Sequence, residues 1–146
     1  MRPIRLKLAD VEFIAFQLAK YLMEWDEPIP SFNTRFPQTL ESCLITPFQK
    51  YEGKFLNKGL FRKGAVLFYL MIKNHPFQNG NKRIAVTTLL VFLATNKFTI
   101  HVSNQSLYKF ARYVAGSRPT TREHVIGEIE NYIHSNSSST EPRADR

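Results

Sequence analysis

The chain has 146 residues, with 20 Lys and Arg against 12 Asp and Glu and a formal net charge of +8. This length fits one ordinary domain and excludes two, and the 43% of hydrophobic residues excludes global disorder. The lone Cys43 excludes an intrachain disulfide framework and a cysteine-built zinc site. The positive charge favours an anionic partner, which leaves nucleic acid, a nucleotide or an acidic protein as candidates.

The sequence lacks the marks of export and of membrane insertion. Residues 1–7 carry no apolar core of the kind that a signal peptide has. The longest unbroken apolar run, Ala65 to Ile72, falls far short of the ~18 residues that a membrane-spanning helix requires. We therefore expect a cytoplasmic protein with no membrane partner.

Helical periodicity predicts a first helix that is followed by a proline-rich loop. Asp10 is a plausible N-cap, and the helix is expected to end before Pro28. Residues 27–37 hold three prolines and predict a loop. The apolar positions of this helix, at steps of three and four residues, are Val11, Ile14, Ala15, Leu18, Leu22 and Trp25.

The next segment predicts one short helix and one irregular connection. Thr39 is expected to cap a helix that buries Leu40, Cys43 and Leu44 and closes before Pro47. Residues 49–58 are largely polar and basic, and we expect them to form a mobile connection.

Two strongly apolar segments, Leu60 to Ile72 and Ile84 to Ala94, form the centre of the predicted fold. Each is apolar nearly all round, which indicates a helix that is buried by neighbours on several sides. Two amphipathic helices follow. The first is capped by Ser103 and stopped by Gly116, and the second begins at a Thr120–Glu123 capping box.

These elements predict an all-α fold of about six helices around a central buried pair. Residues 1–134 form the predicted single domain, and the Ser-rich residues 135–146 are expected to be a disordered tail. The tail has no net charge, so the positive excess lies within the domain. The pattern also allows a short strand pair, a hairpin flap, near Phe98 to Val102 or in the proline-rich loop.

The loop that joins the two buried helices, Asn74 to Arg83, is polar and cationic although both of its flanks are core. Pro76 disfavours the α conformation for His75, so the first helix is expected to end at about Asn74. Gly80 supplies the backbone freedom to turn into the second helix, which begins around Asn81 or Lys82. The free N–H groups of that helix start, together with two cations, predict a phosphate site.

Side chains of this loop suggest a chemistry. Arg83 could bind phosphate oxygens bidentately, and Lys82 would act as a point charge. His75 is a candidate general base for an attacking hydroxyl, and Phe77 is expected to pack inward. A base beside a phosphate cradle favours phosphoryl or nucleotidyl transfer. Each residue alone would indicate only a surface charge, a turn or a helix end.

The nonapeptide from His75 to Arg83 resembles the signature of the Fic/Doc family, which reads His-x-Phe-x-(Asp/Glu)-(Gly/Ala)-Asn-(Gly/Lys)-Arg. Eight of the nine places agree, counting the two unspecified ones, Pro76 and Gln78. Lys82 and the upstream run of residues 40–44, Leu-Glu-Ser-Cys-Leu, are similar to the death-on-curing (Doc) branch. The resemblance is best from about Thr39 to Lys97.

This resemblance implies an enzyme. His75 would be the catalytic base, and Gly80, Asn81, Lys82 and Arg83 would hold the phosphates of ATP. Fic members mostly transfer AMP to a protein hydroxyl. The Doc branch acts as a protein kinase, a toxin that modifies a translation factor such as elongation factor Tu and is neutralised by an antitoxin protein. The family's self-inhibitory motif, Ser/Thr-x-x-x-Glu-(Gly/Asn), has no match here.

One residue departs from the family pattern. The family's acidic residue, which helps to hold Mg²⁺, is Asn79 in this chain. A neutral amide is a poorer Mg²⁺ ligand than a carboxylate, so Asn79 predicts weak metal binding and an attenuated or inactive enzyme. The sequence thus leaves two functions open. One is a Doc-like transferase, and the other is a non-catalytic protein of the same fold that binds an anion, nucleic acid or an acidic protein.

Overall fold

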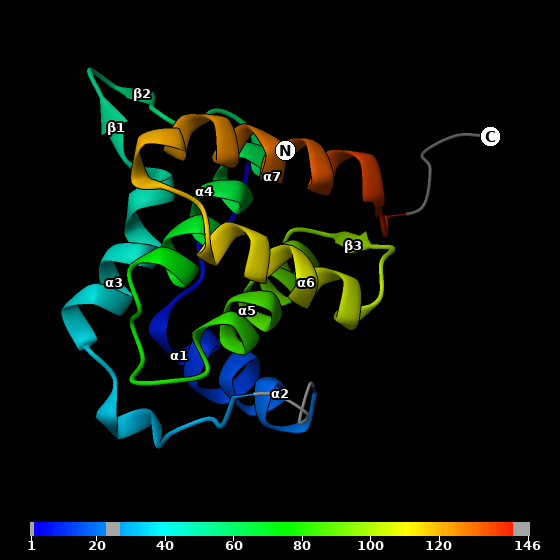
Figure 1. The fold of residues 1–146 in the computed structure, drawn as a ribbon. Coiled ribbons are helices and arrows are strands. Elements are labelled where there is room, and N and C mark those ends of the chain that lie inside the picture. The colour runs from blue at the N-terminus through cyan, green and yellow to red at the C-terminus, as the bar shows by residue number, and fades with distance from the viewer. Residues whose placement is uncertain (1, 23–26, 142–146) are drawn as a thin grey trace.

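The structure is a computed structural model that describes residues 2–22 and 27–141. Helices dominate this part of the chain, and two small antiparallel strand pairs lie at its edges (Figure 1). The elements, in chain order, are α1 (Leu8–Asp10), η1 (Val11–Ala15), α2 (Phe16–Tyr21), η2 (Phe32–Thr34), α3 (Pro37–Ile45), η3 (Thr46–Phe48), β1 (Lys50–Tyr51), β2 (Lys54–Phe55), α4 (Leu60–Lys73), α5 (Asn81–Thr95), β3 (Phe98–Ile100), α6 (Asn104–Ala115), η4 (Pro119–Thr121), α7 (Arg122–Asn136) and β4 (Ser137–Ser139).

Helices α4 and α5 form the predicted central pair. Most of their side chains are buried, because α7, α6 and α3 pack around α4 while α2 and η1 pack against α5 (Figure 1). Since α1, η1 and α2 follow one another without a break, the described residues form about six helices, and the predicted all-α class is confirmed. Cys43 is fully buried in this core, and burial raises the pKa of its thiol to about 12.

The first helix differs from its prediction in two ways. It begins at Leu8, and the Asp10 carboxylate accepts a hydrogen bond from the Lys7 N–H at 2.8 Å, so Asp10 lies inside the first turn and is not the N-cap. Its middle, η1, is a π-helix, whose wider turn shifts the apolar face. Ile14 is consequently 51% exposed, while Ala15 and Phe16 are buried. The expected last position, Trp25, lies outside the described residues.

Residues 49–58 were predicted to form a mobile connection, but part of this segment has regular structure. They contain the β1–β2 hairpin, in which Lys50 pairs with Phe55. The hairpin is held by Lys63, a buried residue of α4 whose Nζ lies 3.9 Å from the centre of the Phe55 ring and donates to the Asn57 carbonyl at 2.6 Å. Burial lowers the pKa of Lys63. Strands of two residues are too short to show an alternating pattern, which explains why the sequence did not predict them.

Helix starts were predicted with mixed success. The Ser103 hydroxyl accepts from the Ser106 N–H at 3.0 Å, as expected for the cap of α6, and Gly116 ends that helix. Helix α3 begins at Pro37, so Thr39 lies within it and is not its cap. The capping box at Thr120 is also wrong, because Thr121 is the N-cap of α7 and its hydroxyl donates to the Arg118 carbonyl.

The C-terminal segment is more ordered than its composition predicted. Ser137–Ser139 forms strand β4, which pairs antiparallel with Phe98–Ile100, so the strand predicted near Phe98 finds its partner in the Ser-rich stretch. Residues 142–146 lie outside the described part, and the domain boundary at residue 134 stays a prediction. In residues 2–22 and 27–141, no helix is long and apolar enough to cross a bilayer.

Candidate functional site

The loop between α4 and α5 places His75 at the surface and Phe77 in the core. Helix α4 ends at Lys73, and His75 adopts a φ of +50°, outside the right-handed helical region that the following Pro76 disfavours. The Phe77 ring lies 5.6 Å from that of Phe16 between centroids, which anchors the loop to the first helix. His75 is exposed, so its imidazole is accessible to a second molecule.

The side chain of Asn81 braces this loop from the first residue of α5. Its Oδ1 accepts from the Phe77 N–H at 3.0 Å, and its Nδ2 donates to the Phe77 carbonyl at 2.9 Å. The same Nδ2 lies 3.5 Å from Nδ1 of His75. Asn81 therefore fixes the loop and positions the imidazole, a role that differs from the direct phosphate contact that the family resemblance implied for its side chain.

Gly80 is required here for both conformation and space. Its φ is +73°, and a Cβ at this position would lie 2.6 Å from Ile29 Cδ1 and 3.0 Å from the Pro28 carbonyl oxygen. The predicted turn at Gly80 is thus confirmed, and α5 begins directly after it, at Asn81. The contact also shows that the segment following Glu27 lies directly against the turn.

A pocket of about 150 Å³ opens beside the loop, and Glu27 occupies the anion position within it. The Glu27 carboxylate accepts from the backbone N–H of Lys82 at 3.2 Å and from its Nζ at 2.9 Å. A carboxylate therefore contacts the helix start and the cation to which the sequence assigned phosphate. The pocket brings together four predicted site residues and Glu27: His75, Asn79, Asn81, Lys82 and Glu27.

Arg83 does not contribute to this pocket. Its side chain is buried and donates to three backbone carbonyls, those of Ala19, Leu22 and Glu27, at 2.5 to 3.0 Å. The guanidinium thus links α5 to the end of α2 and to the segment that carries Glu27. The phosphate role that the sequence assigned to Arg83 stays a prediction, and in this arrangement the side chain is engaged elsewhere.

The residues of the pocket do not fit a magnesium site. The Asn79 Oδ1, its one side-chain oxygen, accepts from the Gly80 N–H at 2.9 Å, and the Glu27 carboxylate is paired with Lys82. Mg²⁺ prefers carboxylate oxygens in octahedral geometry. Across residues 2–22 and 27–141, no group of three or more His, Cys, Asp or Glu gathers to hold a metal.

Sequence reasoning did not identify Glu27 as part of the site. Glu27 lies 55 residues before Lys82, next to a proline-rich loop, and no spacing relates the two. The available signal was chemical, because the loop Asn74–Arg83 carries two cations and no acidic residue of its own. The partly buried cations of such a loop need hydrogen-bond acceptors or a counter-charge from elsewhere in the chain, and Glu27 supplies the counter-charge for Lys82.

The comparisons with known proteins give one finding. A model described as the Fic/DOC family matches residues 6–93, which is more than half of the chain and includes the whole loop from His75 to Arg83. The comparisons with curated proteins and with solved structures found no match.

Proposed function

The chain belongs to the Fic/DOC family, generally a family of transferases, and we propose that it transfers phosphate or AMP from a nucleoside triphosphate to a hydroxyl group of a target protein. The observation that supports this most is the pocket in which an exposed His75 and the amino-terminal residues Asn81 and Lys82 of α5 lie together. This is a base beside an anion site, the arrangement that such a transfer requires.

The proposed reaction assigns one step to each group. The target hydroxyl loses its proton to His75 while its oxygen forms a bond to phosphorus. The bond from that phosphorus to its bridging oxygen breaks. Attack at the γ-phosphorus releases a nucleoside diphosphate, and attack at the α-phosphorus releases pyrophosphate. Lys82 and the N–H groups at the start of α5 stabilise the negative charge of the phosphates.

The pocket is too small for the donor in the described arrangement. Its volume of about 150 Å³ lies below the ~300–1,000 Å³ of typical small-molecule sites. The Glu27 segment must therefore move away before a nucleoside triphosphate enters. By family resemblance we propose a Doc-like cytoplasmic toxin that acts on a translation factor and is held in check by an antitoxin protein.

The decisive experiment is a lysate modification assay. A host lysate is incubated with ATP and the purified protein, and mass spectrometry identifies added phosphate or adenylate by mass. We expect the wild type to modify a protein in the lysate and His75→Ala to modify none. His101→Ala is the control, because His101 is an exposed histidine that directly follows β3, and we expect it to act like the wild type. Absence of any modification, or equal modification by His75→Ala, would remove the catalytic claim.

A non-catalytic binding protein of the same fold is the second candidate. It is favoured by the misfit for Mg²⁺ at Asn79 and by the engagement of Arg83 with backbone carbonyls. Its partner would be an anion, nucleic acid or an acidic protein. An affinity for oligonucleotides that falls steeply with salt concentration would support nucleic acid, because such binding is driven by the release of counterions.

We predict that Asn79→Asp increases metal binding. A carboxylate at this position supplies charged oxygens in place of the single amide oxygen, which is engaged with the Gly80 N–H, so we expect Mg²⁺ to bind about tenfold more tightly in the presence of nucleotide, or ~1.4 kcal/mol. Calorimetric titration of Mg²⁺ into the protein–nucleotide mixture measures this. Gln105→Glu, the same change in charge at an exposed residue of α6 that does not line this pocket, is the control. Equal metal affinities of the wild type and Asn79→Asp would show that position 79 does not contact the metal.

A further inference from the structure

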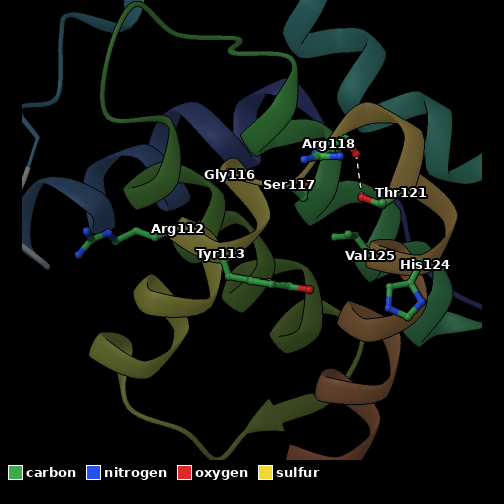
Figure 2. A pocket seen from close by; sticks show the side chains of 8 residues that line it. All are labelled: Arg112, Tyr113, Gly116, Ser117, Arg118, Thr121, His124 and Val125. Carbon is green, nitrogen blue, oxygen red and sulfur yellow. Dashed lines mark hydrogen bonds between the residues drawn. The ribbon is translucent and has the colours of Figure 1, made fainter.

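A second hollow lies between the end of α6 and the start of α7, apart from the His75 pocket (Figure 2). Its volume of about 450 Å³ is three times that of the His75 pocket and falls within the range of ligand sites, ~300–1,000 Å³. Arg112, Arg118 and His124 are among the residues that line it, together with the ring of Tyr113. None of these four residues has a role in the proposed reaction.

Two guanidinium groups lie at this hollow, that of Arg118 at one end of it and that of Arg112 on the other side of α6. Neither Arg112 nor Arg118 has a hydrogen-bond or ion-pair partner for its guanidinium among residues 2–22 and 27–141. A carboxylate of α7, that of Glu128, accepts from the Tyr113 hydroxyl at 2.7 Å and lies 3.7 Å from His124 Nε2, so it offsets part of this positive charge. Figure 2 shows Tyr113 pointing from α6 toward α7, with Arg118 at one end of the hollow.

The hollow adjoins the His75 pocket across the end of α6. Ala115 lines the His75 pocket, and the next residue, Gly116, lines this one. Lys73, two residues before His75, donates to the carbonyls of Ala115 at 3.2 Å and Ser117 at 2.6 Å. These hydrogen bonds connect the end of α6 to the start of the loop between α4 and α5. Residues 112–118 are thus a short ridge between the two pockets.

Arg112 extends the positive charge over this ridge. In Figure 2 its side chain leaves α6 away from Tyr113. Arg112 and Ala115 are three residues apart on the helix, so they share a face, and that face borders the His75 pocket. Positive charge therefore lies on both flanks of the ridge, at Arg112 and at Arg118.

We propose that this hollow binds an acidic segment of the target protein, close in sequence to the hydroxyl that is modified. This inference rests on the proposed function, because it assigns the acceptor substrate of the same site. Arginine forms paired hydrogen bonds with carboxylates. Because consecutive residues, Ala115 and Gly116, line the two pockets, one extended peptide segment, at about 3.3 Å per residue, can contact both. Nucleic acid is less favoured, since single strands need several large stacking rings and, among the lining residues, Tyr113 supplies one and His124 a smaller one.

The test compares two fluorescent peptides, one of repeated Glu-Glu-Ser and one of repeated Gln-Gln-Ser, by fluorescence anisotropy without nucleotide. We expect the Glu peptide to bind at least about tenfold more tightly, and its affinity to fall about tenfold in Arg112→Gln/Arg118→Gln. The control is Arg2→Gln/Arg5→Gln, with the same change in charge. These exposed residues lie on either side of Ile4, whose backbone forms hydrogen bonds with the Asn96 side chain. Asn96 directly follows α5, so the control pair lies at the opposite end of that helix from the His75 pocket. We expect the control to change the affinity less than about twofold.

Two results would overturn the proposal. One is equal binding of the two peptides, and the other is an equal loss in the two arginine pairs, which would indicate an effect of net charge alone. A single-stranded RNA that binds more tightly than the Glu peptide, with the same dependence on Arg112 and Arg118, would assign the hollow to nucleic acid and also overturn it. The assay contains no ATP and measures the binding of the peptide alone. Failure of the transferase assay is therefore distinguishable from failure of this inference.

Discussion

Replacing Arg83 by methionine is expected to lower the free energy of unfolding by about 3–5 kcal/mol, because removing one side of a buried charged contact leaves its hydrogen-bond partners stranded. The guanidinium is buried and donates to the carbonyls of Ala19, Leu22 and Glu27. Methionine keeps the apolar stem but donates nothing. The end of α2 and the Glu27 segment would then lose their attachment to α5.

Chemical denaturation followed by circular dichroism measures this loss. Lys82→Met is the matched control, because Lys82 is the neighbouring cation and its side chain is 26% exposed in a single ion pair with Glu27. We expect the control to lose no more than about 1 kcal/mol. Equal stability of Arg83→Met and the wild type, combined with a loss of nucleotide binding, would contradict the structural role. Such a result would return Arg83 to the phosphate site that the sequence predicted.

The loop between the buried helices was predicted well because its cues are local. Pro76 acts on the residue directly before it, and Gly80 takes a left-handed conformation that few other residues adopt without strain. The end of α4 near Asn74 and the start of α5 at Asn81 follow from these two residues. The burial of the helices on both sides of the loop could also be predicted locally, because each segment is apolar nearly all round.

The partners of the cations could not be predicted in the same way. Arg83 binds carbonyls that lie 56 to 64 residues earlier, and every residue of the chain offers a carbonyl, so no side-chain pattern marks the ones that are used. Local cap signals failed for a related reason. Asp10 and Thr39 both suit a helix N-cap, but the helices begin earlier, at Leu8 and Pro37. The residue at which each helix begins depends on how that helix packs against the rest of the chain, which a local cap signal does not reveal.

Glu27→Gln is expected to increase the affinity for nucleoside triphosphate about tenfold, because the partly buried Glu27–Lys82 ion pair no longer competes with the phosphates. The wild-type carboxylate contacts both the Lys82 N–H and its Nζ. A phosphate must displace it to gain the same donors. Glutamine keeps the size of the side chain and removes the charge, so the contact weakens without leaving a void.

Calorimetric titration of ATP in a buffer with EDTA measures this effect independently of metal and of catalysis. Glu141→Gln, the same change in charge at an exposed residue near the end of the described chain, is expected to leave the affinity within about twofold of the wild type. In the double variant Glu27→Gln/Lys82→Met, the expected increase in ATP affinity should disappear, because the phosphates then lose the cation with which Glu27 is paired in the wild type. An unchanged affinity in Glu27→Gln would mean that phosphate binds elsewhere than at the start of α5, and the proposed positions of donor and base would both fail with it.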